Sequence, residues 1–435
     1  MKYMLDEKKP LKRMFDTLQA HETMMSESIP LIASENVTSQ SVRRALDSDF
    51  MHRYAEGWVG ERVYAGCNYI DAIESECIQM MSELFSAEFV DVRPISGVVA
   101  NLAVYTALTR PGDTTMSLSI PSGGHITTGK YELGGTAGAV HGLKVEYLPL
   151  DHKEMTIDAD AAKKKINALS EQSPETLPKL VVLGASVFLF PHPVKEIAET
   201  VHSIGGNVTY DAAHVAGLIA GKQFQDPLKE GADVMSMSTH KTFFGPQHGA
   251  IVSDGKYADE LKRAVFPGLV SNHHLNAVAG LAVACAEMKE FGESYANQVI
   301  KNAKTLGQAL YERGFNVLAE HKGFTESHQL VIDVTKIGDG GTIEKQLENN
   351  NIIVNRNLLP WDIKEGRHFM HPGGIRLGVS EVTRLGMKQQ EMVDIAEFIK
   401  RALLSKEESG KLREDIKQFR ENYQSVQYCF DSGDA

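Results

Sequence analysis

One lysine and one aspartate stand at equivalent places, directly after short runs of small and apolar residues. Residues 234–238 have the composition of a buried strand, and Lys241 follows them, ahead of a Gly-Pro pair that breaks regular structure. Residues 207–210 form a second such run, which is followed by Asp211. Parallel strands of an open sheet end at one crevice, so both side chains should face the same ligand. A lysine amine can condense with an aldehyde, and a carboxylate can keep a pyridine nitrogen protonated. The pair therefore fits a pyridoxal phosphate site.

Lys241 by itself leaves two interpretations open, because lysines are common after strands and most of them point into solvent. The interval between Asp211 and Lys241 suits one crossover unit, and His214 follows the aspartate closely. These neighbours favour the cofactor site over a solvent-exposed lysine.

Three further segments could approach such a cofactor. Ser96 and Gly97 precede a helical pattern, and the free amides of a helix N-terminus suit a phosphate, although an ordinary serine cap has the same sequence. A Gly-Gly pair precedes His125, which could lie flat on an aromatic ring or belong to a surface loop. Residues 54–66 carry Tyr, Glu, Arg and Gly without periodicity, which is typical of a functional loop.

The elements that must position these residues follow a two-domain α/β pattern. Residues 179–254 alternate strand and helix, which predicts a doubly wound sheet. A long helical segment, expected to break at Phe291 and Gly292, leads to a second set of strands and helices. At 435 residues the chain exceeds the size of one hydrophobic core. We predict a helical arm at 1–28, a large cofactor-binding domain at 29–285 and a smaller C-terminal α/β domain with a surface tail at 286–435.

Composition excludes several classes of protein. The 57 acidic and 45 basic side chains give a net charge of −12, which argues against binding to nucleic acid. No apolar stretch approaches the length of a membrane span, and residues 1–10 lack the apolar core of a secretory signal, so we expect a cytoplasmic protein without a membrane partner. No two cysteines form a close pair, which predicts free thiols and no metal site. The cysteines are Cys67, Cys77, Cys285 and Cys429.

Eight short motifs occur in a fixed order along the chain: Leu-Ile-Ala-Ser-Glu-Asn (31–36), Tyr-Ala-Glu-Gly (54–57), Ser-Gly (96–97), Gly-Gly-His (123–125), Asp-Ala-Ala-His-Val-Ala-Gly (211–217), Thr-His-Lys-Thr (239–242), Phe-Pro-Gly (266–268) and Gly-Ile-Arg-Leu-Gly (374–378). Together they resemble the serine hydroxymethyltransferase family, whose members are pyridoxal phosphate enzymes of the aspartate aminotransferase-like fold type I. The resemblance runs from about residue 31 to 384. A Phe-Phe-Gly-Pro-Gln run and a Ser-Asn-His-His run are most similar to the archaeal branch, whose one-carbon carrier is often tetrahydromethanopterin.

The resemblance implies a reversible reaction in which serine and a tetrahydropterin give glycine and methylene-tetrahydropterin. The carrier is then tetrahydromethanopterin or tetrahydrofolate. By position, Lys241 matches the lysine that forms the Schiff base, Asp211 the partner of the pyridinium nitrogen, and His125 the histidine stacked on the ring. The other matched cofactor contacts within the chain are Ser96, Gly97 and His240 at the phosphate, and Ser186 and His214 at the ring.

The resemblance also implies a homodimer with shared active sites. Glu56 matches a glutamate, supplied by the neighbouring subunit, that handles the proton of the serine hydroxyl and meets the pterin. Tyr54 and Asn272 match positions that reach the partner's phosphate, and Tyr64 matches an active-site tyrosine. The matched substrate contacts are Arg376 and Ser34 at the carboxylate of serine or glycine, and Asn357 at the pterin.

Three places depart from the common bacterial pattern of that family. Val63 replaces a second tyrosine that packs on folate, Gln247-His248 replaces Arg-Gly, and Ser271-Asn272 replaces the Gly-Gly that reaches the partner's phosphate. The missing aromatic ring at Val63 favours a differently shaped pterin. Two rival functions stay open: an enzyme of the same fold such as a threonine aldolase or an α-methylserine hydroxymethyltransferase, and a catalytically silent binding protein. Slow cleavage of threonine without pterin is also expected.

Overall fold

The structure, a computed structural model, describes residues 10–405 and 409–430. Its larger part is built on a seven-stranded sheet, whose strands are β4 (Phe89–Asp91), β5 (Thr114–Ser117), β6 (Lys144–Tyr147), β9 (Pro178–Gly184), β10 (Asn207–Asp211), β11 (Val234–Ser238) and β12 (Gly249–Ser253). Their order is β4-β12-β11-β10-β9-β5-β6. The five strands from β11 to β6 are parallel, which confirms the predicted mostly parallel sheet. β12 is antiparallel to both of its neighbours, because residues 239–248 are too few for a helical crossover.

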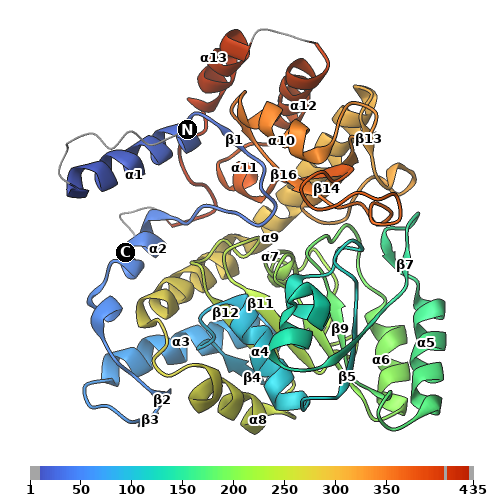
Figure 1. The fold of residues 1–435 in the computed structure, drawn as a ribbon. Helices are drawn as coiled ribbons and strands as arrows, with labels where there is room; N and C mark the ends of the chain where they lie inside the picture. Colours follow the sequence, from blue (N-terminus) through green and yellow to red (C-terminus); the bar gives the residue numbers. More distant parts are fainter. Residues whose placement is uncertain (1–9, 406–408, 431–435) are drawn as a thin grey trace.

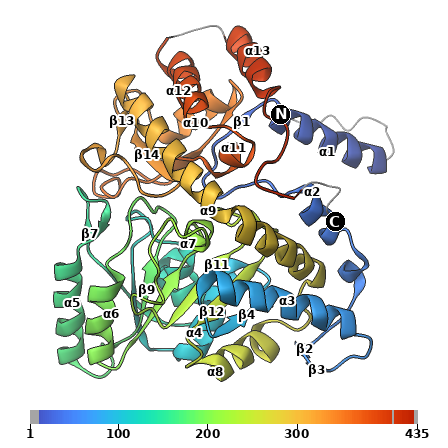
Figure 2. The same cartoon turned by 180° about the vertical axis from the view of Figure 1, so that it is seen from behind.

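Helices cover both faces of this sheet (Figures 1 and 2). The helices of the larger part are α2 (Gln40–Leu46), α3 (Asn68–Phe85), α4 (Gly97–Leu108), α5 (Ala159–Gln172), α6 (Val194–Ser203), α7 (Ala216–Ala220) and α8 (Ala258–Arg263). Burial on both faces explains why the central strands read as continuous apolar runs. On β9, Val181 and Leu183 join one hydrophobic cluster, whereas the alternate residues Leu180 and Val182 join the other. Two short strand pairs complete this part: β2 (Gly57–Trp58) with β3 (Glu61–Arg62), and β7 (Leu150–Asp151) with β8 (Thr156–Ile157).

The smaller part lies above the larger one in Figure 1 and has its own sheet. Its strands, in the order β13-β14-β17-β16, are all antiparallel: β13 (Asn316–Val317), β14 (Gln329–Asp333), β17 (Gly374–Gly378) and β16 (Asn355–Asn357). Its helices are α10 (Gly340–Glu348), α11 (Ser380–Arg384), α12 (Gln389–Leu403) and α13 (Ser409–Arg420). β1 (Ile29–Pro30) pairs with β15 (Ile352–Ile353), so the chain meets the smaller part before it enters the larger one. The division at 28/29 and 285/286 stays a prediction.

One long helix, α9 (Leu275–Glu312), joins the two parts. The predicted break at Phe291 and Gly292 was wrong, because α9 passes through both residues without interruption. Gly292 lies instead where α9 packs closely on the end of α7. A Cβ atom on Gly221, after α7, would lie 2.4 Å from the carbonyl oxygen of Gly292, whereas a Cβ atom on Gly292 would lie 2.5 Å from Met288 Sδ.

The helical arm predicted at 1–28 is α1 (Pro10–Ser26), and the first nine residues of that prediction lie outside the described residues. No residue of α1 is buried, and Figure 1 shows the helix standing away from the rest of the chain. The predicted surface helix near the C-terminus is α13, whereas its expected frayed end at 431–434 lies outside the described residues. All four cysteines are free. Within residues 10–405 and 409–430 no helix has the length and apolar character needed to cross a membrane.

Candidate active site

The candidate active site is a cavity of about 150 Å³ at the carboxyl ends of β9, β10 and β11. Asp211 is the last residue of β10, and Lys241 follows β11 by three residues. The parallel register of the two strands places Asp211 beside Ser236, so both strand ends open onto the same cavity. The structure brings eight of the predicted residues together in its lining: Ser96, Gly97, His125, Ser186, Asp211, His214, His240 and Lys241.

The carboxylate of Asp211 is held in one orientation at this cavity. Its side chain is buried, with Oδ2 accepting from Asn101 Nδ2 at 2.8 Å and Oδ1 accepting from the backbone N–H of Ala213 at 3.0 Å. Asn101 Nδ2 also donates to Thr127 Oγ1 at 3.0 Å, and Thr127 Oγ1 lies 2.8 Å from His125 Nδ1. One chain of hydrogen bonds therefore links the aspartate to the histidine.

Sequence reasoning missed Asn101 and Thr127, which connect two predicted site residues. A signal for Asn101 existed, because it is a buried polar residue in α4, whose other buried residues are Ala100, Ala103, Val104 and Tyr105. Buried amides need partners, so a buried asparagine one turn after the Ser-Gly start of a helix indicates a polar network. Thr127 carried no comparable signal.

Lys241 is 8 % exposed, and burial lowers the pKa of its amine to about 8, although the negative charge of Asp211 acts in the opposite direction. The positive charge of Arg376 contributes to the same lowering. The backbone of Lys241 is fixed by Asn36, whose Nδ2 donates to the carbonyl oxygen of Lys241 at 2.6 Å. A fixed lysine with a lowered pKa supplies a neutral, nucleophilic amine near neutral pH.

One end of the cavity has the features of a phosphate site. Ser96 caps α4 by accepting from the backbone N–H of Val99 at 3.2 Å, which leaves its own O–H free to donate. A Cβ atom on Gly97 would lie 2.4 Å from Ser238 Oγ, so only glycine lets the helix start so close to the strand end. The Nδ1 atom of His240 is buried without a hydrogen-bond partner in the described chain. A helix N-terminus and an unpaired ring nitrogen fit a phosphate group.

Arg376, on β17 of the smaller part, does not line the cavity but contacts Ser186, which does. Its Nη1 donates to the carbonyl oxygen of Ser186 at 2.6 Å, and its Nε donates to Asn355 Oδ1 at 3.3 Å. Burial lowers the pKa of Arg376 to about 10, so the guanidinium stays charged at neutral pH. Ser34 lies between Ala33, whose carbonyl oxygen contacts the ring of His328, and Asn36, which holds Lys241. A residue of the smaller part therefore contacts the wall of the cavity.

His214, which lines the cavity, stacks on His328 with ring centroids 5.6 Å apart. Burial lowers the pKa of His328 to about 3 and that of His214 well below its usual value, so both rings are neutral near pH 7. Gln329 Nε2 lies 2.7 Å from His214 Nδ1 and donates to the carbonyl oxygen of Ser186 at 3.0 Å. Ser186 thus accepts from both Gln329 and Arg376, which joins the ring side of the cavity to the arginine.

Comparison with known proteins agrees with this geometry. The serine hydroxymethyltransferase family model matches residues 8–399. The chain is 57% identical to the serine hydroxymethyltransferase of Nitrosopumilus maritimus over 98% of this chain and 96% of that protein. It is 56% identical to that of Methanocaldococcus jannaschii over 96% of this chain and 95% of that protein. This chain belongs to the serine hydroxymethyltransferase family.

A solved structure supports fold type I for this chain. An L-threonine transaldolase from Pseudomonas fluorescens superposes with a TM-score of 0.86 at 29% identity, covering 97% of this chain and 94% of that one. Both predictions, the family and the fold class, are therefore confirmed. The activity of the family is a pyridoxal phosphate-dependent one-carbon transfer that uses serine and glycine.

Several residues predicted for the hydroxymethyltransferase site lie outside the cavity of their own chain. Tyr54 and Tyr64 are 48% and 45% exposed, and their rings contact each other with centroids 5.0 Å apart. Glu56 lies between them in sequence, and Val63 is 69% exposed. None of these four side chains lines the 150 Å³ cavity. They form, with Asn272 close by, a surface that we call the Glu56 loop (residues 53–64).

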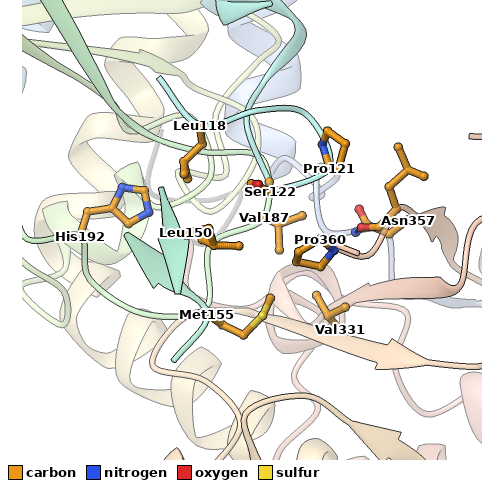
Figure 3. A pocket seen from close by; sticks show the side chains of 12 residues that line it. Leu118, Pro121, Ser122, Leu150, Met155, Val187, His192, Val331, Asn357 and Pro360 are labelled. Carbon is orange, nitrogen blue, oxygen red and sulfur yellow. Dashed lines mark hydrogen bonds between the residues drawn. The ribbon is translucent and has the colours of Figure 1, made fainter. Parts of the chain in front are cut away.

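Asn357, the predicted pterin contact, lies at a separate small pocket between the two parts (Figure 3). Figure 3 shows it opposite Pro121 and Ser122, which belong to the turn that leads to His125. Asn357 Nδ2 donates to the carbonyl oxygen of Leu358 at 2.7 Å. The pocket holds only about 10 Å³, so it is close to the size of one water molecule.

Proposed function

We propose that this hydroxymethyltransferase moves the hydroxymethyl carbon of serine to a tetrahydropterin through the cavity that contains Lys241 and Asp211. The single observation that supports this assignment most strongly is the pairing of a buried lysine, with a pKa of about 8, and a fully hydrogen-bonded aspartate in one cavity. When bound, pyridoxal phosphate supplies an electron-accepting ring that takes up the electron pair released as the Cα–Cβ bond breaks.

The residues of the chain divide the remaining work. Lys241 would hold the cofactor through its aldehyde, and Asp211 would hold a proton on the pyridine nitrogen, while Asn101 orients the carboxylate for that contact. His125, oriented through Thr127, would contact the ring. The start of α4 and His240 would bind the phosphate.

Arg376 and Ser34 bind the carboxylate of serine in this proposal. A guanidinium offers two parallel N–H donors to a carboxylate, and Arg376 has N–H groups beyond the two that Ser186 and Asn355 use. Cleavage of the Cα–Cβ bond requires the Cβ hydroxyl of serine to lose its proton, and Asp211 is the only carboxylate among the described residues that line the cavity. A further group is needed there to take the hydroxyl proton.

We propose that the Glu56 loop of a second copy supplies that group, so that the active enzyme is a homodimer. Two neighbouring tyrosines that are each nearly half exposed support a contact surface, because aromatic residues are enriched where protein surfaces meet. Glu56 then accepts the hydroxyl proton, and Tyr54, Tyr64 and Asn272 complete the cavity of the partner.

The carrier follows from the same surface. Val63 offers no ring for stacking and is exposed, which favours tetrahydromethanopterin over tetrahydrofolate as the second substrate, with Asn357 contacting the pterin.

Serine labelled at Cβ with carbon-13 tests the function directly. The purified holoenzyme is mixed with this serine and with either carrier, and the label is followed by NMR. The expected result is label in the methylene group of the carrier, together with unlabelled glycine, at a higher kcat/KM with tetrahydromethanopterin. Cleavage of threonine to glycine and acetaldehyde, without any transfer from serine, would instead identify an aldolase.

A further inference from the structure

The Glu56 loop is held rigidly within its own chain, although it faces solvent. The carbonyl oxygen of Ala55 accepts from Arg62 Nη1 at 2.9 Å, and that of Glu56 accepts from the backbone N–H of Val63 at 3.0 Å. The carbonyl oxygen of Gly57 accepts from both Arg62 and Arg93 at 3.2 Å. Groups of the same chain therefore hold the backbone of this exposed loop at three successive carbonyl oxygens, through Arg62, Arg93 and the backbone N–H of Val63.

The segment just before α9 supplies the contacts on the other side of the loop. Asn272 Oδ1 accepts from the backbone N–H of Ala55 at 2.9 Å, and Asn272 Nδ2 donates to the carbonyl oxygen of Arg53 at 3.0 Å. The amide side chain therefore bridges the residues on either side of Tyr54. Its own backbone N–H makes no hydrogen bond to a residue of the described chain, so it stays available to a ligand.

A buried ionic cluster anchors both segments to α3. Glu74 Oε2 lies 2.9 Å from Arg62 Nη2 and 2.8 Å from His273 Nε2, and these three side chains are 1%, 3% and 2% exposed. Asp71 adds a second partner for Arg62, at 2.7 Å from its Nε. Burial alone would raise the pKa of Glu74, but His273 and Arg62 outweigh it and lower that pKa. Arg62 thus anchors the loop, and His273 anchors its neighbour in the chain, Asn272.

Ser271 makes the contact that bears on chemistry. Its hydroxyl donates to Oε1 of Glu56, and Oε2 of Glu56 makes no hydrogen bond to any described residue. One oxygen of the carboxylate is therefore fixed while the other is free to accept a proton. A glutamate that rotates about its side-chain bonds seldom presents its carboxylate in the orientation that proton transfer needs. A hydrogen bond to one oxygen restricts this rotation.

We propose that Ser271 is a positioning residue for Glu56: its hydroxyl holds one carboxylate oxygen so that the other meets the hydroxyl of serine bound to a second copy of the chain. This inference rests on the proposed function, and it assigns a role to a position where the common bacterial sequence has glycine. Ser271 does not touch the substrate. Its removal should slow the step that needs Glu56 and leave other steps of the same cavity unchanged.

Two reactions of one holoenzyme separate these steps. Transfer from serine needs a group that takes the hydroxyl proton, whereas exchange of the α-proton of glycine with deuterated solvent does not, because glycine has no hydroxyl. Ser271→Ala should lower kcat for serine transfer about tenfold, with the KM for serine and the glycine exchange rate within about twofold of the unsubstituted enzyme. Ser271→Thr, which keeps a hydroxyl, should restore most of the rate.

Ser294→Ala is the matched control, since Ser294 is an exposed serine whose hydroxyl donates to the backbone carbonyl of Phe291 at 2.9 Å. It should leave both reactions unchanged. Equal rates for Ser271→Ala and the unsubstituted enzyme in serine transfer would overturn the proposal, and so would a parallel loss of both reactions. Failure of the proposed function looks different, because then the unsubstituted enzyme itself exchanges glycine without transferring carbon from serine.

Discussion

The cavity around Lys241 and the Glu56 loop are two regions of one proposed active site, yet the chain builds them in opposite ways. Lys241 and Asp211 are 8% and 6% exposed, and sheet register brings them together. Tyr54 and Tyr64 are about half exposed, on a loop with only two-residue strands. The cavity forms within one chain, whereas the exposed tyrosines of the loop do not line that cavity.

This difference teaches which forces position each half of the site. The strands pack in the hydrophobic core, so their ends have fixed positions once the chain has folded. Lys241 and Asp211 lie at these ends and are therefore fixed as well. The Glu56 loop contacts hydrophobic clusters only through Ala55 and Trp58, so polar side chains do most of this work: Arg62 and Asn272 hold its backbone, and Ser271 its carboxylate. Rigidity without burial is expected where a surface must be ready for a second subunit.

The largest effect should come from separating the two halves between subunits. Lys241→Ala should lower serine transfer at least about 10³-fold and Glu56→Gln at least about 10²-fold, since one removes the covalent attachment and the other the proton acceptor. A heterodimer with one substitution in each chain has one site with both an intact cavity and an intact loop. Isolated through two different affinity tags, it should show about half of the activity of the unsubstituted dimer.

The control heterodimer carries both substitutions in one chain and none in the other. If the sites are shared, each of its two sites lacks one half, and it should be inactive. Sites complete within one chain give the reverse: an active control and an inactive first heterodimer. The measurement therefore distinguishes the two arrangements without knowledge of the interface.

Glu74→Gln tests the ionic anchor of the loop. It leaves Arg62 and His273 without the buried charge that faces them, so the free energy of unfolding should fall by about 3–5 kcal/mol. Glu83 lies on the same helix, is 44% exposed and pairs with Lys289. Glu83→Gln should therefore change the free energy of unfolding by less than about 1 kcal/mol. Urea unfolding of the holoenzymes provides both values. Equal losses would show that burial of the cluster is unimportant.

Burial of the cavity makes a prediction about pH. A neutral amine attacks the cofactor aldehyde, and the pKa of about 8 for Lys241 means that this form appears at a lower pH than in an exposed lysine. The rate at which the apoenzyme captures pyridoxal phosphate should rise about tenfold per pH unit below 8 and level off above it. Stopped-flow absorbance gives the profile. A rise that continues to pH 10 would contradict the lowered pKa, and Lys241→Ala, which lacks the amine, is the control.

Part of the candidate site could be predicted from the sequence, and whether a residue could be predicted depends on how its position is fixed. Lys241, Asp211 and Ser96 follow or precede regular elements, so local patterns locate them and parallel topology gathers them. Thr127 takes part through a contact between α4 and a distant turn, which no local pattern encodes. The predicted break at Gly292 failed because α9 continues through the glycine and packs there against Gly221, and this tertiary contact has no local sequence pattern.

The smallest effect should come from restoring an aromatic ring to the loop. Val63→Tyr offers a surface for stacking, and one aromatic contact contributes about 0.5–1.5 kcal/mol, so the KM for tetrahydrofolate should fall about two- to tenfold. The KM for tetrahydromethanopterin should stay the same or rise, because that pterin is proposed to fit the site without the ring. Val140→Tyr is the matched control, since Val63 and Val140 are both 69% exposed. If both variants leave tetrahydrofolate kinetics unchanged, Val63 does not face the pterin, and the choice of carrier must depend on residues inside the cavity instead of those on the loop.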